Sequence, residues 1–151
     1  MMLRFAQTIC CLATTMLHCV QIYDILLLEV NNDMKEDKLG TLSMELSVEV
    51  LNLVKKLRTK KENIISNQIG RSATSICANI AESKYGHSRA DFIAKLEIAL
   101  KEASETGKWL EMLYKTNYID ALTFKRIDKI CSTIRVLLIT SIKTAKKNSN
   151  S

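Results

Sequence analysis

The chain has 151 residues, of which 47% are hydrophobic and 5% aromatic, with four glycines and no proline. This length suits one domain and is short for two, while the scarcity of helix breakers and of aromatic residues favours helices and disfavours a β-sandwich. The net charge of +6 is uneven, because residues 1–33 hold one arginine against three acids. The basic body favours polyanionic partners, although such a charge can equally serve solubility.

The first 33 residues differ from the rest in composition. No residue from Phe5 to Tyr23 carries a full charge, and Arg4 precedes this run, as in a signal peptide or a short membrane span. Polar residues interrupt the run and no clean cleavage site follows it, whereas Met34 opens a charged stretch that suits the start of a cytoplasmic protein. We therefore expect residues 1–33 to be an extension outside the fold or a misassigned start, and the protein to be cytoplasmic, without membrane contact.

Two amphipathic helices are predicted next, because apolar residues recur at intervals of three and four. The first spans residues 42–60, ends in a basic turn that the helix dipole favours, and carries the stripe Leu42, Leu46, Val50, Leu53, Val54 and Leu57. The second spans residues 63–85 and has small surface residues that let a neighbouring backbone approach closely. Its stripe is Ile65, Ile69, Ala73, Ile76, Cys77 and Ile80, and the small residues are Ser72, Ser75, Ala78 and Ala81.

A third helix follows the turn at Gly86 and His87, with Ser88 as its N-cap and Asp91 in its first turn. Its apolar residues alternate at spacings of four and three over three heptads, which is typical of a bundle seam. They are Phe92, Leu96, Ala99, Ala103, Thr106, Leu110 and Leu113.

Asn117 or Asp120 ends the third helix and begins a fourth. The fourth stripe is Ile127, Cys131, Ile134, Leu138, Ser141 and Ala145, widened by Ile130 and Leu137. Four amphipathic helices joined by short links predict an all-α, antiparallel up-down-up-down four-helix bundle over residues 34–147. Residues 148–151 are expected to be a disordered tail.

The sequence offers no recognisable catalytic or cofactor site. His18 and His87 are the only histidines, so no histidine-based metal site or catalytic triad can be assembled, and no glycine-rich phosphate-binding motif occurs. The five cysteines form no CxxC pair, and Cys77 and Cys131 lie on apolar faces, where they are interpreted as small buried hydrophobes. We therefore predict a protein that is not an enzyme and has no metal and no cofactor.

One motif, SATSICANIAES at residues 72–83, places polar residues on a helix otherwise built from small and apolar ones. Together with the following SRADFIAKLEIALKEASET, it resembles the four-helix-bundle family encoded in intervening sequences of bacterial 23S ribosomal RNA genes. The family motif reads roughly SIPANIAEG, so Cys77 stands at its proline and Ser83 at its final glycine. The resemblance rests on Ser75, Ile76, Asn79, Ile80, Ala81, Glu82, Phe92, Leu96, Ala99 and Leu100.

The resemblance implies a helical bundle that assembles as a homopentamer and is associated with ribosomal RNA genes. It also implies a relationship to the accessory variability determinant protein of diversity-generating retroelements, which binds nucleic acid and its reverse transcriptase. The motif residues Ser75, Asn79, Ala81, Glu82 and Phe92 are interpreted as structural. A polar group at a helix or subunit contact fixes the register.

Two points about the motif stay open from the sequence. Arg71 and Arg89 are both placed to pair with Glu82. The alternative to a structural role for Asn79 and Glu82 is a small polar pocket open to a ligand.

The up-down-up-down order predicts one strongly basic end of the bundle, where the first helix ends and the fourth begins. Lysines at the end of the first helix suit the helix dipole, but cations in the first turns of the fourth helix do not. Because Tyr114 and Tyr118 are the only rings expected nearby, contacts to the nucleic-acid backbone are favoured over base stacking. The predicted nucleic-acid-binding residues are Lys55, Lys56, Arg58, Lys60, Lys61, Lys125, Arg126 and Lys129.

The leading hypothesis is a non-enzymatic homo-oligomer that associates with RNA or DNA through this basic end. The alternative is a protein-binding adaptor or accessory subunit, for example of a reverse transcriptase, that does not touch nucleic acid. A second apolar stripe on the third helix, at Ile93, Leu100 and Tyr114, predicts oligomerisation because it exceeds what one bundle buries.

Overall fold

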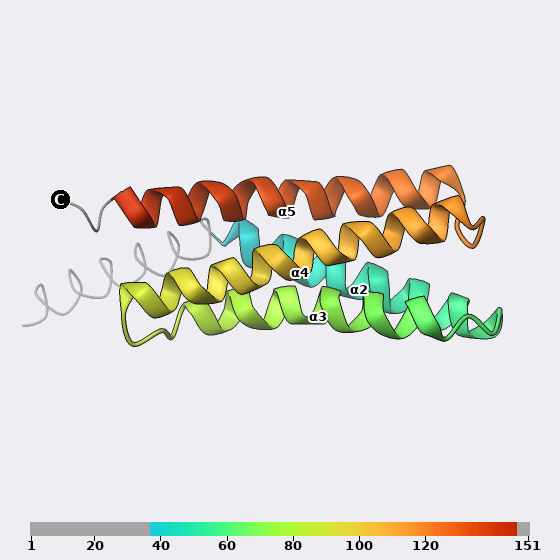
Figure 1. The fold of residues 1–151 in the computed structure, drawn as a ribbon, viewed down its shortest axis with the longest axis horizontal. Helices are drawn as coiled ribbons and strands as arrows, with labels where there is room; N and C mark the ends of the chain where they lie inside the picture. The colour runs from blue at the N-terminus through green and yellow to red at the C-terminus, as the bar shows by residue number, and fades with distance from the viewer. Residues whose placement is uncertain (1–36, 148–151) are drawn as a thin grey trace, which may run out of the picture. The chain divides into compact units, whose positions relative to one another are not determined.

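A computed structural model describes residues 37–147; the predicted extension at residues 1–33 and the predicted tail at residues 148–151 lie outside the described residues. The described part contains α2 (Lys38–Thr59), α3 (Ile64–Ser83), α4 (Arg89–Lys115) and α5 (Ala121–Lys147). Successive helices run in opposite directions, and α5 returns beside α2 (Figure 1). The prediction of an all-α, antiparallel four-helix bundle is confirmed.

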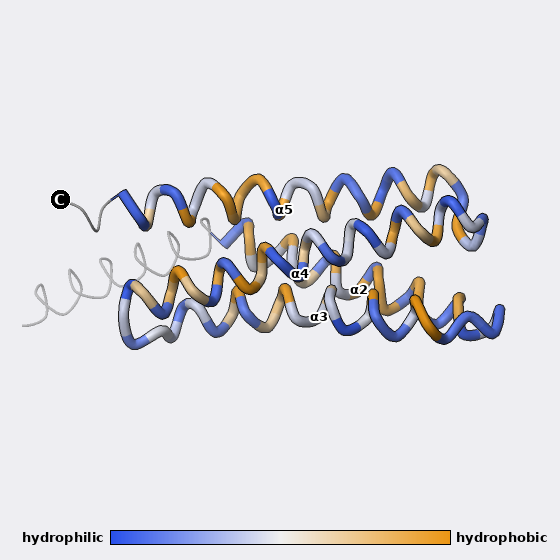
Figure 2. Tube along the Cα trace, in the orientation of Figure 1, coloured by the Kyte–Doolittle hydropathy of each residue, from blue (hydrophilic) through white to orange (hydrophobic). Residues whose placement is uncertain are grey.

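The core follows the predicted stripes closely. Hydrophobic residues recur about once per turn along each helix (Figure 2), and the stripe of α4 from Leu96 to Leu113 is buried throughout. One residue of the α5 stripe is different, since Ser141 is half-buried and Ile142 is buried in its place. Positions three and four residues after Leu138 both border the core, and burying the larger apolar side chain gains more free energy.

Small residues bring α2 and α3 close together, but they are not the four that the sequence analysis named, of which Ala78 and Ala81 are exposed. The Ser47 hydroxyl donates to the carbonyl oxygen of Ala73 at 3.1 Å, and a Cβ atom built on Gly70 would lie 3.4 Å from Val54. Between α3 and α4, the buried Thr106 Oγ1 lies 2.8 Å from Ser72 Oγ. Each of these buried hydroxyls has a hydrogen-bond partner, which removes most of the cost of burying it.

Helix boundaries agree with the predictions to within a few residues. Ser88 is the N-cap of α4, with its hydroxyl accepting the Asp91 N–H at 3.1 Å. The first helix begins at Lys38, one turn earlier than predicted, and α3 continues through Cys77, where the family motif has proline. Cys131 is buried as predicted, whereas Cys77 is only half-buried.

No helix within residues 37–147 is both long and apolar enough to cross a membrane. In the same range, no three side chains of the metal-ligating types His, Cys, Asp and Glu come together as a group that could hold an ion. Burial raises the pKa of the Cys131 thiol to about 11, so this cysteine stays protonated and unreactive at neutral pH.

Candidate nucleic-acid interface

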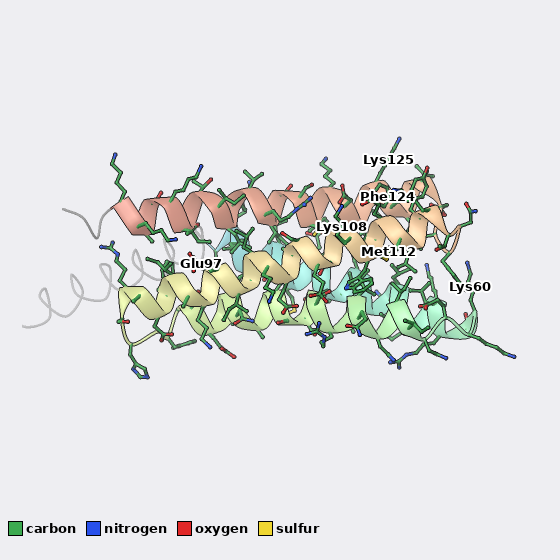
Figure 3. The ribbon with its side chains drawn as sticks, in the orientation of Figure 1. Lys60, Glu97, Lys108, Met112, Phe124 and Lys125 are labelled. Carbon is green, nitrogen blue, oxygen red and sulfur yellow. The ribbon has the colours of Figure 1, made fainter. Side chains whose placement is uncertain are left out.

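The antiparallel topology brings all eight predicted nucleic-acid-binding residues to one end of the bundle. The end of α2 and the beginning of α5 lie together there, beside both short connections (Figure 1). Lys60 and Lys125 extend from this end (Figure 3). Lys108 precedes the end of α4 by seven residues and Lys129 follows the start of α5 by eight, so both lie farther towards the middle. All eight side chains are exposed. We call this surface the basic end, defined by Lys55, Lys56, Arg58, Lys60, Lys61, Lys125, Arg126 and Lys129.

Three of the eight cations have partners within the protein. Arg126 forms an ion pair with Glu49 of α2, Arg58 donates to the Asn67 side chain at 3.2 Å, and Lys60 donates to the backbone oxygen of Tyr118 at 2.9 Å. None of the remaining five forms an ion pair with any described residue. These five ammonium groups are Lys55, Lys56, Lys61, Lys125 and Lys129.

Lys61 lies in the left-handed region, with φ of 60°. The Glu62 and Lys61 N–H groups donate to Leu57 O and Arg58 O, both at 3.0 Å, which is the hydrogen-bond pattern of a Schellman motif. Glycine is the usual residue at such a position because other L-residues are strained there. A lysine is therefore held at the tip of the α2–α3 connection at some cost in stability.

Two acidic residues near the basic end cap helices. Glu62 is buried, and its carboxylate accepts the N–H groups of Ile65 and Ser66 at 2.9 and 2.8 Å, at the start of α3. Asp120 accepts the Thr123 N–H at 2.7 Å at the start of α5. Hydrogen bonds from Thr123 hold the pKa of Asp120 below its usual value, so this carboxylate stays ionised and offsets part of the basic charge.

Glu111 of α4 neutralises two further cations. Its carboxylate pairs with Lys108 at 3.1 Å and with Lys115 at 2.8 Å, and the hydrogen bond from Lys115 is the largest cause that lowers the pKa of Glu111. This shared carboxylate makes Lys108 and Lys115 weaker candidates for binding a polyanion.

More aromatic side chains lie near the basic end than the two tyrosines expected from the sequence. Tyr114 of α4 stacks on Phe124 of α5, with ring centroids 4.9 Å apart and planes inclined by 14°. Tyr118 is half-buried in the loop between these helices. Phe124 was missed because its neighbour in space lies on another helix, although its position one residue before Lys125 was visible in the sequence.

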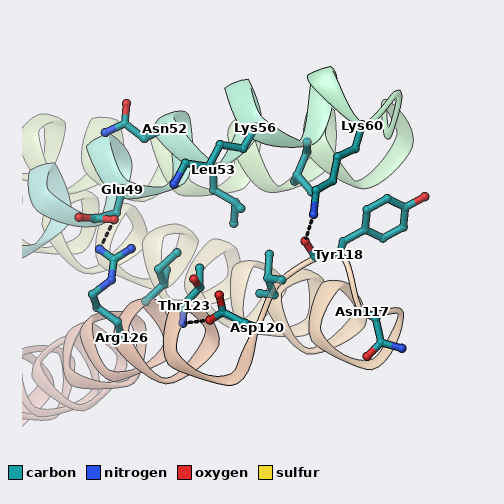
Figure 4. A pocket seen from close by; sticks show the side chains of 13 residues that line it. Glu49, Asn52, Leu53, Lys56, Lys60, Asn117, Tyr118, Asp120, Thr123 and Arg126 are labelled. Atoms are coloured by element: carbon teal, nitrogen blue, oxygen red, sulfur yellow. Dashed lines mark hydrogen bonds and ion pairs between the residues drawn. The ribbon is translucent and has the colours of Figure 1, made fainter.

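A cavity of about 490 Å³ opens at the basic end between α2 and the start of α5. Its floor is apolar, and its rim carries Lys56, Lys60 and Arg126 together with the carboxylates of Glu49 and Asp120 (Figure 4). Helices α2 and α5 contact each other less than the other neighbouring helices do. The cavity is therefore a consequence of the most open seam of the bundle, which periodicity within single helices does not reveal.

The family-motif residues lie on α3 and α4, away from this cavity. Asn79 donates to the backbone oxygen of Ser75 at 2.8 Å, one turn earlier on its own helix. Ala81 is exposed, and Phe92 is half-buried and packs against the core. Asn79 and Phe92 therefore make contacts within the bundle, and the structural role of the motif stays a prediction.

Glu82 pairs with Lys95 at 2.6 Å, which the sequence analysis did not propose as its partner. The hydrogen bond and the charge of Glu82 raise the pKa of Lys95. Arg71, one of the two partners expected for Glu82, pairs instead with Glu105 at 2.9 Å. The pairing reflects how α3 and α4 align, because Glu82 and Lys95 face each other across the antiparallel seam.

Comparison with known proteins agrees with this fold. Residues 35–140 match the family described as 23S rRNA-intervening sequence protein. No curated protein matches the sequence significantly. A crystal structure of a protein of unknown function from the S23 ribosomal protein family of Bacteroides thetaiotaomicron is 48% identical, with a TM-score of 0.68, covering 70% of this chain and 98% of that one. The chain therefore belongs to the 23S rRNA-intervening sequence protein family.

Proposed function

We propose that the protein is a cytoplasmic, non-enzymatic homo-oligomer that binds RNA or DNA through its basic end. The observation that carries this proposal is the group of five exposed lysines at one end of the bundle with no ion pair to any described residue. Two of them, Lys125 and Lys129, are the fifth and ninth residues of α5 and lie about one turn apart on one exposed face.

The chemistry of the basic end suits the phosphate backbone. Lysine ammonium groups bind phosphate as point charges and release condensed counterions, which makes the affinity depend strongly on salt. The opposite end of the bundle differs, because Lys95 and Lys146 are paired there with Glu82 and Glu97 at 2.6 Å. A polyanion would therefore meet more uncompensated charge at the basic end.

The test replaces Lys125 and Lys129 together by glutamine and measures affinity for a labelled RNA or DNA strand across a salt series. Both side chains are exposed, so helicity and oligomer size should stay unchanged. If each lysine neutralises one phosphate, the slope of log affinity against log salt should fall by roughly 1.4 for a single strand. The loss should be similar for strands of different sequence.

The chain supplies a matched control on the same helix. Lys143 and Lys147 have the same four-residue spacing, are exposed, and lack an ion pair within the described range, but lie at the other end of α5. Their replacement by glutamine should change affinity much less. Equal losses from both pairs would mean that net charge is responsible, and no binding by the unmodified protein at low salt would favour the adaptor hypothesis.

An exposed apolar stripe on α2 supports the oligomeric part of the proposal. Met44, Val48 and Leu51 are 57%, 50% and 43% exposed, and their spacing of four and three residues puts them on one face. The stripe named from the sequence is less available, because Ile93 and Leu100 pack against the core and Tyr114 stacks on Phe124. The α2 stripe is therefore the better candidate contact between copies.

A further inference from the structure

The cavity at the basic end combines three kinds of surface in one space. Leu53, Leu57 and Ile127, none of them more than 5% exposed, form much of its floor. The side chains of Asn52 and Thr123 add uncharged hydrogen-bonding groups at the rim. Lys56, Lys60 and Arg126 supply positive charge. A ligand that uses all three has an apolar body, a polar edge and an anionic group.

Two interactions bridge the open seam and frame the cavity. The ion pair between Glu49 and Arg126 links α2 to α5 on one side, and the hydrogen bond from Lys60 to Tyr118 O links α2 to the α4–α5 loop on the other (Figure 4). The cavity between them is about 490 Å³, within the range of ~300–1,000 Å³ that is usual for small-ligand sites.

The lining excludes the simplest ligands. A bare phosphate would leave the apolar floor unused. A cation would meet three positively charged side chains. A nucleotide fits better, because its base has apolar faces and a hydrogen-bonding edge and its phosphate is anionic. In a duplex the faces are covered by stacked neighbours, so only an unpaired nucleotide can present them.

We propose that this cavity holds one unpaired nucleotide of a bound strand, with the base on the Leu53 and Ile127 floor and the phosphate at Lys56. The proposal rests on the nucleic-acid function proposed above and adds a preference for single strands. Lys125 and Lys129 would then contact neighbouring phosphates outside the cavity, because neither lines it.

The first test compares a labelled single strand with a blunt-ended duplex of two strands and equal phosphate number, using the full-length protein at low salt. The single strand should bind about tenfold more tightly, because only its bases can bury apolar faces in the cavity. Asn52→Trp, which fills the rim without changing charge, should abolish this preference. Gln68→Trp should not, since Gln68 is exposed near the same end on α3 but does not line the cavity.

A second pair of variants keeps the test valid if Asn52→Trp fails to fold, as judged by circular dichroism. Lys55 and Lys56 are adjacent and exposed, and neither has an ion pair to a described residue, but only Lys56 lines the cavity. Lys56→Gln should weaken single-strand binding several-fold more than Lys55→Gln, while both should affect the duplex alike.

The outcomes separate the two proposals. Equal affinity for strand and duplex, with Asn52→Trp harmless and Lys55 and Lys56 equivalent, would overturn the nucleotide site and leave backbone binding by the basic end intact. Failure of the unmodified protein to bind either probe at low salt would overturn the proposed function and this site with it.

Discussion

At the residue scale, Lys61 shows a local conflict between stability and charge. Its φ of 60° is matched across the basic end by Asn117, with φ of 58°, which ends α4 in the same way. Asparagine tolerates this conformation better than lysine because its short side chain can hydrogen-bond locally. The α2–α3 connection therefore carries a lysine at a position where glycine or asparagine would stabilise the backbone more.

Lys61→Gly should raise the free energy of unfolding by about 0.5–1 kcal/mol, because it removes left-handed strain. It should also weaken nucleic-acid binding through the lost charge. Urea denaturation at one fixed protein concentration measures the first effect. Lys61→Asn is the control, since it loses the same charge but should gain less stability. A less stable glycine variant would show that contacts of the lysine side chain outweigh the strain.

At the scale of elements, α3 has two faces with different requirements. Ala73 is fully buried, and its backbone oxygen accepts the Ser47 hydroxyl of α2, so the two backbones leave no room for a larger side chain. Ala78, five residues later on the same helix, is exposed. The composition of α3 does not tell which of these two alanines is buried. The spacing of the core stripe does, because Ala73 lies on it and Ala78 does not.

Ala73→Leu should therefore lower the free energy of unfolding by about 1–3 kcal/mol through overpacking between α2 and α3. Ala78→Leu, the same change on the exposed face, should stay within about 0.5 kcal/mol of the parent. Urea midpoints of the two variants measure the difference. Equal effects would mean that α2 and α3 can separate to accept the added volume.

At the scale of the whole molecule, the bundle exposes a surface that its own core does not use. Met44, Val48 and Leu51 form an apolar stripe on α2 that faces away from the core residues Leu46, Val50 and Leu53. Exposed apolar surface of this kind is characteristic of contacts between chains. A ring of copies would repeat the basic end around one rim and raise the avidity for a long polyanion.

The full-length protein should sediment as a closed homo-oligomer, with five subunits expected from the family resemblance. Val48→Glu should shift it to smaller species, because a charge buried in the contact has no partner. Gln68→Glu introduces the same charge at an exposed position on α3 and should leave the size unchanged. A parent protein that stays monomeric at all concentrations would contradict this prediction.

The sequence by itself determined the helices, their buried faces and their order. Spacings of three and four residues placed nearly every core residue, and the short connections left antiparallel pairing as the economical arrangement. The gathering of eight cations at one end followed from that order. These features are predictable because each depends on neighbours within a turn or on the sequence of elements.

The tertiary structure decided which side chains meet across seams. It paired Glu82 with Lys95, placed Glu49 against Arg126, stacked Phe124 on Tyr114 and left a cavity between α2 and α5. Each depends on the axial alignment and spacing of helices far apart in the chain, which side-chain packing sets to within ångströms. Periodicity within one helix carries no information about that alignment.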